Sequence, residues 1–396
     1  MEKPKYLVPM SSPDLNDADR QAVAEVLSTN YLSMGPKNEA FEKAVTEYLN
    51  ISHAISVNSG TAGLHLSVRA SGFKPGDYII TTPFSFVSST NVLLFENLIP
   101  IFVDVDQKTG NIDPVLVRQA ASDLKSGDVK KAEKWLSRKG FKETGELGGI
   151  LAVDVFGQPA DYDVLQRIAD EEKLILIEDS CEAIGAEYKH QKAGSFGDYG
   201  VFAFYPNKQM TTGEGGMIVT NNSKAADLMC ALRNQGRAPG DNWLQHTHLG
   251  YNYRLDEMSA ALGLSQISRI DELINRREEV ASWYNKQLSK IDGVEIPNIS
   301  TDTTRMSWFV YVIRIDQRFD RDKVAKKLDQ AGIPVRPYFL PIHLQPYMAE
   351  KFGYKAGDFP ITEDLGRRSL ALPFSGVMTE DQVTLVCTRL EENLRS

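Results

Sequence analysis

Lys208 follows a run of residues that we expect to form a buried strand. Residues 200–204 are apolar and aromatic, which is typical of a strand in a protein core. Pro206 and Asn207 end this run, and a glycine-rich turn follows the lysine. A lysine held out of water at the end of a strand is suited to form a Schiff base with a carbonyl compound. The flanking residues favour this interpretation over that of an exposed loop lysine.

A second reactive group, Asp179, follows another expected strand. Residues 174–177 are consecutive aliphatic residues, a pattern that indicates a strand buried on both faces of a parallel sheet. In open α/β sheets, ligands bind outside the carboxyl ends of the strands. Pyridoxal 5'-phosphate (PLP) requires a lysine for its aldehyde and a carboxylate that faces its pyridine nitrogen. Lys208 and Asp179 could supply these groups, although a helix N-cap is an alternative role for Asp179.

The turn that contains Ser59, Gly60 and Thr61 has the composition of a phosphate-binding site. A short strand is expected before it, at residues 54–57, and a helix with apolar periodicity after it. The free N–H groups at the start of a helix, the helix dipole and nearby hydroxyls can together bind an anion. We therefore predict that this turn binds the cofactor phosphate, although an ordinary N-cap would have the same composition.

The three segments described above belong to a longer series of motifs along the chain. The motifs are Leu-Ser-Met-Gly-Pro at 32–36, Asn-Ser-Gly-Thr at 58–61, Glu-Asp at 178–179, Gly-Ser-Phe-Gly-Asp at 194–198, Pro-Asn-Lys at 206–208, Thr-Thr-Gly-Glu-Gly-Gly at 211–216, Gly-Tyr-Asn-Tyr-Arg at 250–254, Val-Arg-Pro-Tyr at 335–338 and Pro-Ile-His at 341–343. Over nearly its whole length, the chain resembles the DegT/DnrJ/EryC1/StrS family of sugar aminotransferases. The resemblance implies a PLP enzyme of the aspartate-aminotransferase fold (fold type I).

The resemblance also implies roles for three more residues at the cofactor. Phe86 matches an aromatic residue that stacks on the cofactor ring, and Glu182 lies where the family often has Gln or His near the 3'-oxygen. Asn252 matches a phosphate ligand that is donated by the neighbouring subunit, which implies a C2 homodimer with shared active sites. A core aromatic and a turn asparagine are the alternatives for Phe86 and Asn252.

Two residues match positions on the substrate side of the site. Arg254 is a candidate for a cofactor or substrate phosphate, with a solvated or carboxylate-paired arginine as the alternative. His343 matches a family histidine, with a packed and hydrogen-bonded loop histidine as the alternative.

Position 203 departs from the family pattern. Many relatives have a serine there, five residues before the lysine, and its hydroxyl binds the cofactor phosphate, but this chain has Ala203.

Lys208 itself favours amine transfer, because relatives that act as sugar 3-dehydratases have histidine at the position of this lysine. Residues 211–216 resemble the subgroup that aminates C4 of nucleotide-linked 4-keto-6-deoxyhexoses.

The resemblance implies a reaction that moves an amino group from L-glutamate to C4 of a nucleotide-linked keto-deoxy sugar. Alternatives are amination at C3, another keto sugar or a cyclitol as acceptor, or a PLP-binding regulatory protein without catalysis. A nicotinamide oxidoreductase would need a glycine fingerprint after the first strand, and residues 58–63 lack its spacing.

The alternation of strand-like and helical patterns from about residue 50 to 220 predicts an α/β fold with a mostly parallel sheet. We expect a large PLP-binding domain at residues 1–265, with a surface insertion at 125–148. Residues 266–396 are expected to form a linker helix and a small α+β C-terminal domain. Residues 256–288 read as one long helix that links the two domains, and residues 307–315 read as a strand of the C-terminal domain.

Composition excludes several other classes of protein. The formal net charge of −9 argues against binding to nucleic acid or to an anionic membrane surface. The three cysteines show neither a disulfide framework nor zinc-ligand spacing, so no metal site is predicted. The first residues lack a signal-peptide pattern, and no apolar run approaches the roughly 20 residues of a membrane span. We therefore expect a cytoplasmic protein.

Overall fold

The computed structural model describes residues 6–136, 145–238 and 240–395. Within these residues, seven strands form one sheet in the order β1-β9-β8-β5-β4-β2-β3. The strands are β1 (His53–Val57), β2 (Tyr78–Thr81), β3 (Ile99–Phe102), β4 (Leu147–Val153), β5 (Ile175–Asp179), β8 (Tyr199–Ala203) and β9 (Gly216–Thr220). β9 is antiparallel to both of its neighbours, while the pairs from β8 to β3 are parallel. The predicted α/β class with a mostly parallel sheet is confirmed.

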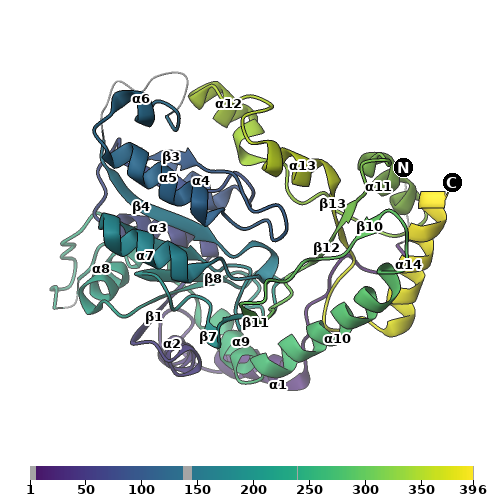
Figure 1. Cartoon of the computed structure of the whole chain (residues 1–396). Coiled ribbons are helices and arrows are strands. Elements are labelled where there is room, and N and C mark those ends of the chain that lie inside the picture. Colours follow the sequence, from purple (N-terminus) through teal and green to yellow (C-terminus); the bar gives the residue numbers. More distant parts are fainter. Residues whose placement is uncertain (1–5, 137–144, 239, 396) are drawn as a thin grey trace.

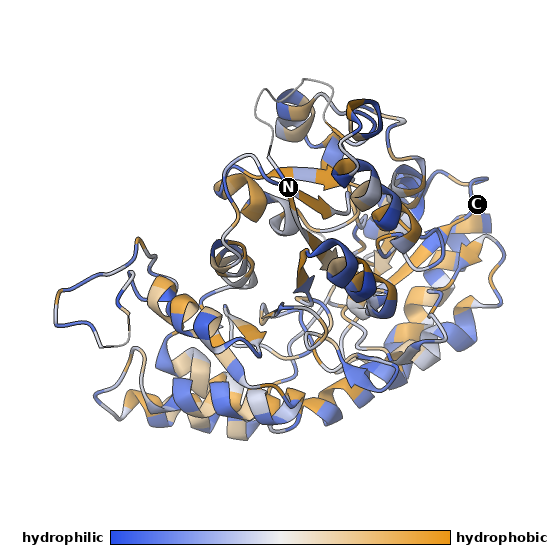
Figure 2. Cartoon of the chain, turned by 60° about the vertical axis from the view of Figure 1, so that its left-hand side comes forward, coloured by the Kyte–Doolittle hydropathy of each residue, from blue (hydrophilic) through white to orange (hydrophobic). Residues whose placement is uncertain are grey.

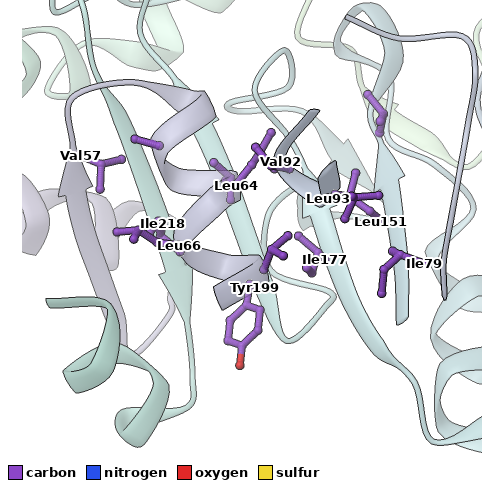
Figure 3. Close-up of a cluster of buried hydrophobic side chains, with 14 of the residues drawn as sticks. Val57, Leu64, Leu66, Ile79, Val92, Leu93, Leu151, Ile177, Tyr199 and Ile218 are labelled. Carbon is purple, nitrogen blue, oxygen red and sulfur yellow. The ribbon is translucent and has the colours of Figure 1, made fainter. Parts of the chain in front are cut away.

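Helices cover both faces of this sheet (Figure 1). One face packs against α3 (Gly60–Ala70), α4 (Ser88–Phe95) and α8 (Ser223–Arg233), and the other against α2 (Pro36–Leu49), α5 (Pro114–Lys125), α7 (Tyr162–Glu172) and α9 (Glu257–Ile267). Figure 3 shows the first of these contacts, where Leu64 and Leu66 of α3 pack toward strand residues such as Ile177 and Ile218. Burying each such side chain stabilises the fold by about 1.5–3 kcal/mol.

A smaller sheet lies beside the large one, on the right of Figure 1. In the described residues it consists of three antiparallel strands, β10 (Val294–Glu295), β12 (Tyr311–Ile315) and β13 (Ser369–Leu372). It shares a core with α10 (Ile270–Leu288), α11 (Arg321–Gln330) and α14 (Glu380–Arg395). Figure 2 shows the same pattern across the chain: the strands inside are mostly hydrophobic, and the helices alternate between hydrophobic and hydrophilic residues.

Packing crosses the expected boundary at residue 265 in both directions. Val8 belongs to the core of the smaller sheet, and the N–H of Leu7 donates to the carbonyl of Gly332 at 2.9 Å. Conversely, Ile342 and Met348 pack in a core of the large sheet. The division into residues 1–265 and 266–396 stays a prediction.

Two elements differ from expectation. The helix expected at residues 256–288 is divided into α9 and α10 at Ser268 and Arg269, and the Arg269 side chain bonds Asp14 and Asp19 there. The strand expected at 307–315 begins only at Tyr311. The reason is that Trp308 has a φ of 53°, a left-handed conformation that a strand does not allow.

The other described α-helices and β-strands are short or peripheral. They are α1 (Asp17–Leu27), α6 (Val129–Ala132), α12 (Pro346–Phe352), α13 (Pro360–Arg368), and a minor sheet of β6 (Glu187–Tyr188), β7 (Gln191–Lys192) and β11 (Thr303–Arg305). The helix α6 lies within the expected insertion at 125–148, of which residues 137–144 are outside the described part. None of the helices in the described ranges has the length and apolar character that crossing a membrane requires.

Candidate active site

A cavity of about 560 Å³ opens at the carboxyl ends of the parallel strands. Asp179 ends β5 and Ala203 ends β8, and both line the cavity. Phe309 and residues 337–340, from the C-terminal part of the chain, close another side. Predicted site residues that line this cavity are Ser59, Gly60, Thr61, Phe86, Asp179, Glu182 and Lys208. The position agrees with the general rule for ligand sites in α/β sheets.

Lys208 lies in the turn between β8 and β9 with its amine directed into the cavity. Its backbone N–H donates to the carbonyl of Tyr205 at 2.9 Å, which fixes the turn. The Nζ atom lies 3.7 Å from Glu182 Oε1 and 3.7 Å from the centroid of the Phe309 ring. The side chain is only 12% exposed, so the amine is largely removed from water, as expected of a Schiff-base lysine.

The Asp179 carboxylate is buried and held in one orientation. Its Oδ2 atom accepts a hydrogen bond from Ser89 Oγ at 2.6 Å, and Ser85 Oγ lies 2.8 Å from Ser89 Oγ. Its Oδ1 atom accepts from the N–H of Cys181 at 3.3 Å. The bond of 2.6 Å from Ser89 has the length of a strong hydrogen bond to a carboxylate, and it fixes the direction of the group. The serines are near the first turn of α4, and sequence reasoning did not identify them.

Glu182 faces the lysine from the segment that follows β5. Its Oε2 atom accepts from the N–H of Phe156 at 2.9 Å, and its carbonyl accepts from Gln209 Nε2 at 2.6 Å. Burial raises the pKa of Glu182 above its usual range, against the opposing effect of the Lys208 ammonium. The carboxyl therefore binds a proton more readily than an exposed glutamate does.

The expected phosphate turn begins α3. Ser59 is its N-cap, and Ser59 Oγ accepts from the N–H of Ala62 at 3.1 Å. The hydroxyl of Thr61 donates to Ser88 Oγ at 3.0 Å. A Cβ at Gly60 would lie 2.7 Å from Ala203 Cβ, so only glycine allows the start of α3 to approach the end of β8 this closely. The first turn of α3 consequently lies against the cavity.

These groups match the chemical parts of PLP. The Lys208 amine suits its aldehyde, the Asp179 carboxylate suits its ring nitrogen, and the start of α3 suits its phosphate. Phe86 lines the same cavity and is 62% exposed, so its ring is available for stacking. The cavity volume lies within the range of about 300–1,000 Å³ that is usual for ligand sites.

Asn252 and Arg254 are not among the described residues that line this cavity. Asn252 is exposed and forms an isolated β-bridge with Asn234. The Arg254 guanidinium donates to Asn234 Oδ1 at 2.9 Å and to Gln235 Oε1 at 3.3 Å. In one chain, both residues are therefore outside the cavity, and their predicted roles stay predictions.

His343 is also absent from the described residues that line the cavity. It is fully buried, and its Nε2 atom lies 3.0 Å from Glu363 Oε1. Burial lowers the pKa of His343 below its usual value, while the Glu363 carboxylate opposes this effect. A role on the substrate side stays a prediction.

Comparison with known proteins places nearly the whole chain in one family. The model of the DegT/DnrJ/EryC1/StrS aminotransferase family matches residues 13–391. The chain is 34% identical to GDP-perosamine synthase of Caulobacter vibrioides, with 98% of each chain covered. It is 31% identical to UDP-4-amino-4,6-dideoxy-N-acetyl-beta-L-altrosamine transaminase of Campylobacter jejuni, with 85% of each covered.

A solved structure agrees with these sequence matches. Helicobacter pylori PseC, an aminotransferase involved in the biosynthesis of pseudoaminic acid, superimposes with a TM-score of 0.87 at 28% identity and covers 98% of this chain and 99% of its own. The family match identifies an enzyme, which sets aside the alternative of a regulatory protein without catalysis. The chain belongs to the DegT/DnrJ/EryC1/StrS aminotransferase family and is a PLP-dependent aminotransferase.

Proposed function

We propose that this enzyme transfers an amino group from L-glutamate to C4 of a nucleotide-linked keto-deoxy sugar. The observation that carries the reaction is the Lys208 amine in the same cavity as the Asp179 carboxylate. The sugar substrate is supported by the names of the relatives in Caulobacter vibrioides and Campylobacter jejuni, the second of which specifies a 4-amino sugar. The resemblance of residues 211–216 to the C4 subgroup adds to this support.

The residues of the cavity have distinct parts in this reaction. When bound, PLP supplies an electron sink that stabilises negative charge on a carbon next to the nitrogen. Lys208 Nζ takes the proton from the α carbon of the amino donor and gives a proton to the sugar carbon in the second half of the reaction. Glu182, at 3.7 Å, holds this amine toward the cavity. Asp179, oriented by Ser89, favours a positive charge on the pyridine nitrogen.

Feeding a panel of acceptors to the enzyme tests this proposal. Protein loaded with pyridoxamine 5'-phosphate is mixed separately with nucleotide-linked 4-keto and 3-keto deoxy sugars and with a keto cyclitol. Mass spectrometry and NMR then identify the product and the aminated carbon. An amine at C4 supports the proposal, and an amine only at C3 or on the cyclitol contradicts it. Reloading the enzyme with L-glutamate, and with other amino acids as controls, tests the donor.

Ala203 lines the cavity beside the start of α3. We expect Ala203→Ser to tighten PLP binding by about 10- to 100-fold, because a hydrogen bond to a charged acceptor contributes about 1.5–3 kcal/mol. Titration of the cofactor-free protein with PLP, followed by absorbance, measures this change. Weaker binding by the variant would show that the serine hydroxyl does not reach the phosphate, or that it disturbs the contact with Gly60.

We also propose that the active enzyme is a C2 dimer in which Asn252 reaches the partner's cofactor phosphate. The exposure of Asn252 outside its own cavity supports this arrangement. Equal amounts of Lys208→Ala and Asn252→Ala proteins, unfolded and refolded together, are expected to regain about a quarter of wild-type activity. After random association, half of the dimers contain one subunit of each variant, and each of these mixed dimers has one intact site out of two. Failure to regain activity, although mixed dimers form, would contradict shared sites.

A further inference from the structure

Arg277 is a buried cation next to the candidate active site. It lies on α10 and is 3% exposed. Its Nη2 atom donates to the carbonyl oxygens of Lys208 at 2.6 Å and of Asn207 at 3.3 Å. Its Nη1 atom donates to the carbonyl oxygens of Trp308 at 3.1 Å and of Phe309 at 3.2 Å. One guanidinium therefore joins two segments that are distant in the sequence.

These two segments carry groups that meet inside the cavity. The Nζ atom of Lys208 lies 3.7 Å from the centroid of the Phe309 ring. Arg277 thus donates hydrogen bonds to the backbone carbonyls of both Lys208 and Phe309. Trp308, just before Phe309, has a φ of 53°. Such a conformation costs free energy in a bulky residue and persists where surrounding bonds enforce it, and the bond from Arg277 is one of these.

The contacts of Arg277 are those of a residue that positions the backbone and not those of an ion pair. In the described part of the chain, its guanidinium donates its hydrogen bonds to main-chain carbonyls. Burial lowers the pKa of Arg277 to about 10, so the group stays charged near neutral pH. A buried cation costs free energy that an apolar side chain would avoid. In return, its planar guanidinium directs several strong hydrogen bonds at fixed angles.

We infer that Arg277 is a positioning residue, whose guanidinium sets the place of the Lys208 amine relative to the Phe309 ring. This inference rests on the role of Lys208 proposed above. The face of the ring stabilises positive charge on Nζ. The carboxyl groups of Glu182, at 3.7 Å, of Asp179 and of Glu214 also line the cavity, together with the Cys181 thiol and the phenols of Tyr205 and Tyr338. A substitution at Arg277 leaves all of these groups in the chain.

The variant Arg277→Lys tests the inference, because it keeps the charge and removes the planar fork. The bound cofactor's visible absorption is titrated with pH in the wild-type and variant proteins. We expect the midpoint to fall by about 0.5 pH unit, since the Phe309 ring would stabilise the charged nitrogen less. We also expect the cofactor-free variant to capture PLP about 10-fold more slowly, because its amine is misplaced.

Arg314→Lys is the matched control. Arg314 lies on β12 of the smaller sheet, and its guanidinium donates to the carbonyl oxygens of Gln107 at 2.5 Å and of Lys108 at 2.7 Å. It also joins distant segments through main-chain carbonyls, but it contacts neither Lys208 nor Phe309. We expect its pH midpoint and capture rate to equal those of the wild-type protein.

Three results would overturn the inference. One is an Arg277→Lys protein with the wild-type midpoint and capture rate, and another is an equal change in Arg314→Lys. If Arg277→Lys does not fold, as judged by circular dichroism, Phe309→Leu tests the same contact between the ring and the Lys208 amine. An unchanged pH midpoint in Phe309→Leu is the third result. A wild-type protein without a borohydride-stable PLP adduct at Lys208 would instead overturn the proposed role of Lys208, and this inference with it.

Discussion

Replacing Lys208 with alanine is expected to abolish transamination and to remove the covalent attachment of PLP to the chain. The Nζ atom is a partly buried amine in a cavity that also contains Asp179. Loss of a positioned general base alone lowers a rate by about 10²- to 10⁴-fold, and the loss of the covalent link adds to this effect. The rate of the half-reaction with L-glutamate, followed by absorbance, measures the first loss. Mass spectrometry after borohydride reduction measures the second.

Lys192→Ala is a suitable control for this experiment. Lys192 also has a carboxylate partner, Glu187 Oε1 at 3.3 Å, and an aromatic partner, the Tyr48 ring at 4.3 Å. It lies on β7 and is not one of the described residues that line the cavity. We expect this variant to keep both its activity and its borohydride-stable adduct. An adduct that survives in Lys208→Ala would contradict the proposed attachment.

Replacing Asp179 with asparagine is expected to have the second largest effect. The amide has nearly the same shape and can still accept from Ser89, but it has no negative charge to hold a positive pyridine nitrogen. Removing one partner of a buried charge pair costs about 3–5 kcal/mol. We therefore expect the half-reaction with L-glutamate to slow by about 10²- to 10⁴-fold at saturating PLP.

Ser89→Ala separates the orientation of Asp179 from its charge. This variant keeps the carboxylate and removes the hydrogen bond of 2.6 Å. Losing one hydrogen bond to a charged group corresponds to a smaller decrease in the rate, of about 10- to 100-fold.

A rate in Asp179→Asn equal to that of the wild-type enzyme, measured with PLP bound, would show that the Asp179 carboxylate does not face the ring nitrogen.

Local sequence patterns were sufficient for much of the fold. The aliphatic run before Asp179 and the aromatic run before Lys208 are the strands β5 and β8, which are adjacent and parallel. Their carboxyl ends consequently lie at the same edge of the sheet. The turn at Ser59 could be recognised because a strand and a helix flank it closely. In each case the signal lies within a few residues of the predicted group.

Features that depend on distant packing could not be predicted in this way. Phe309 lies against Lys208 only because the smaller sheet packs beside the large one. Ser89 has no distinctive local pattern, since a serine in the first turn of a helix is common. Nor does the sequence show that bulky Trp308 adopts a left-handed conformation. The predicted role of Asn252 depends on a second subunit, which a single chain does not contain.

The wall of the cavity formed by Phe309 and residues 337–340 has a consequence for biosynthesis. A chain emerging from the ribosome presents Asp179 and Lys208 long before these residues are made. The reactive amine is then without the aromatic neighbour that it has in the finished protein. We therefore expect the complete cavity to form only after residues up to 340 have been translated and have packed against the large sheet.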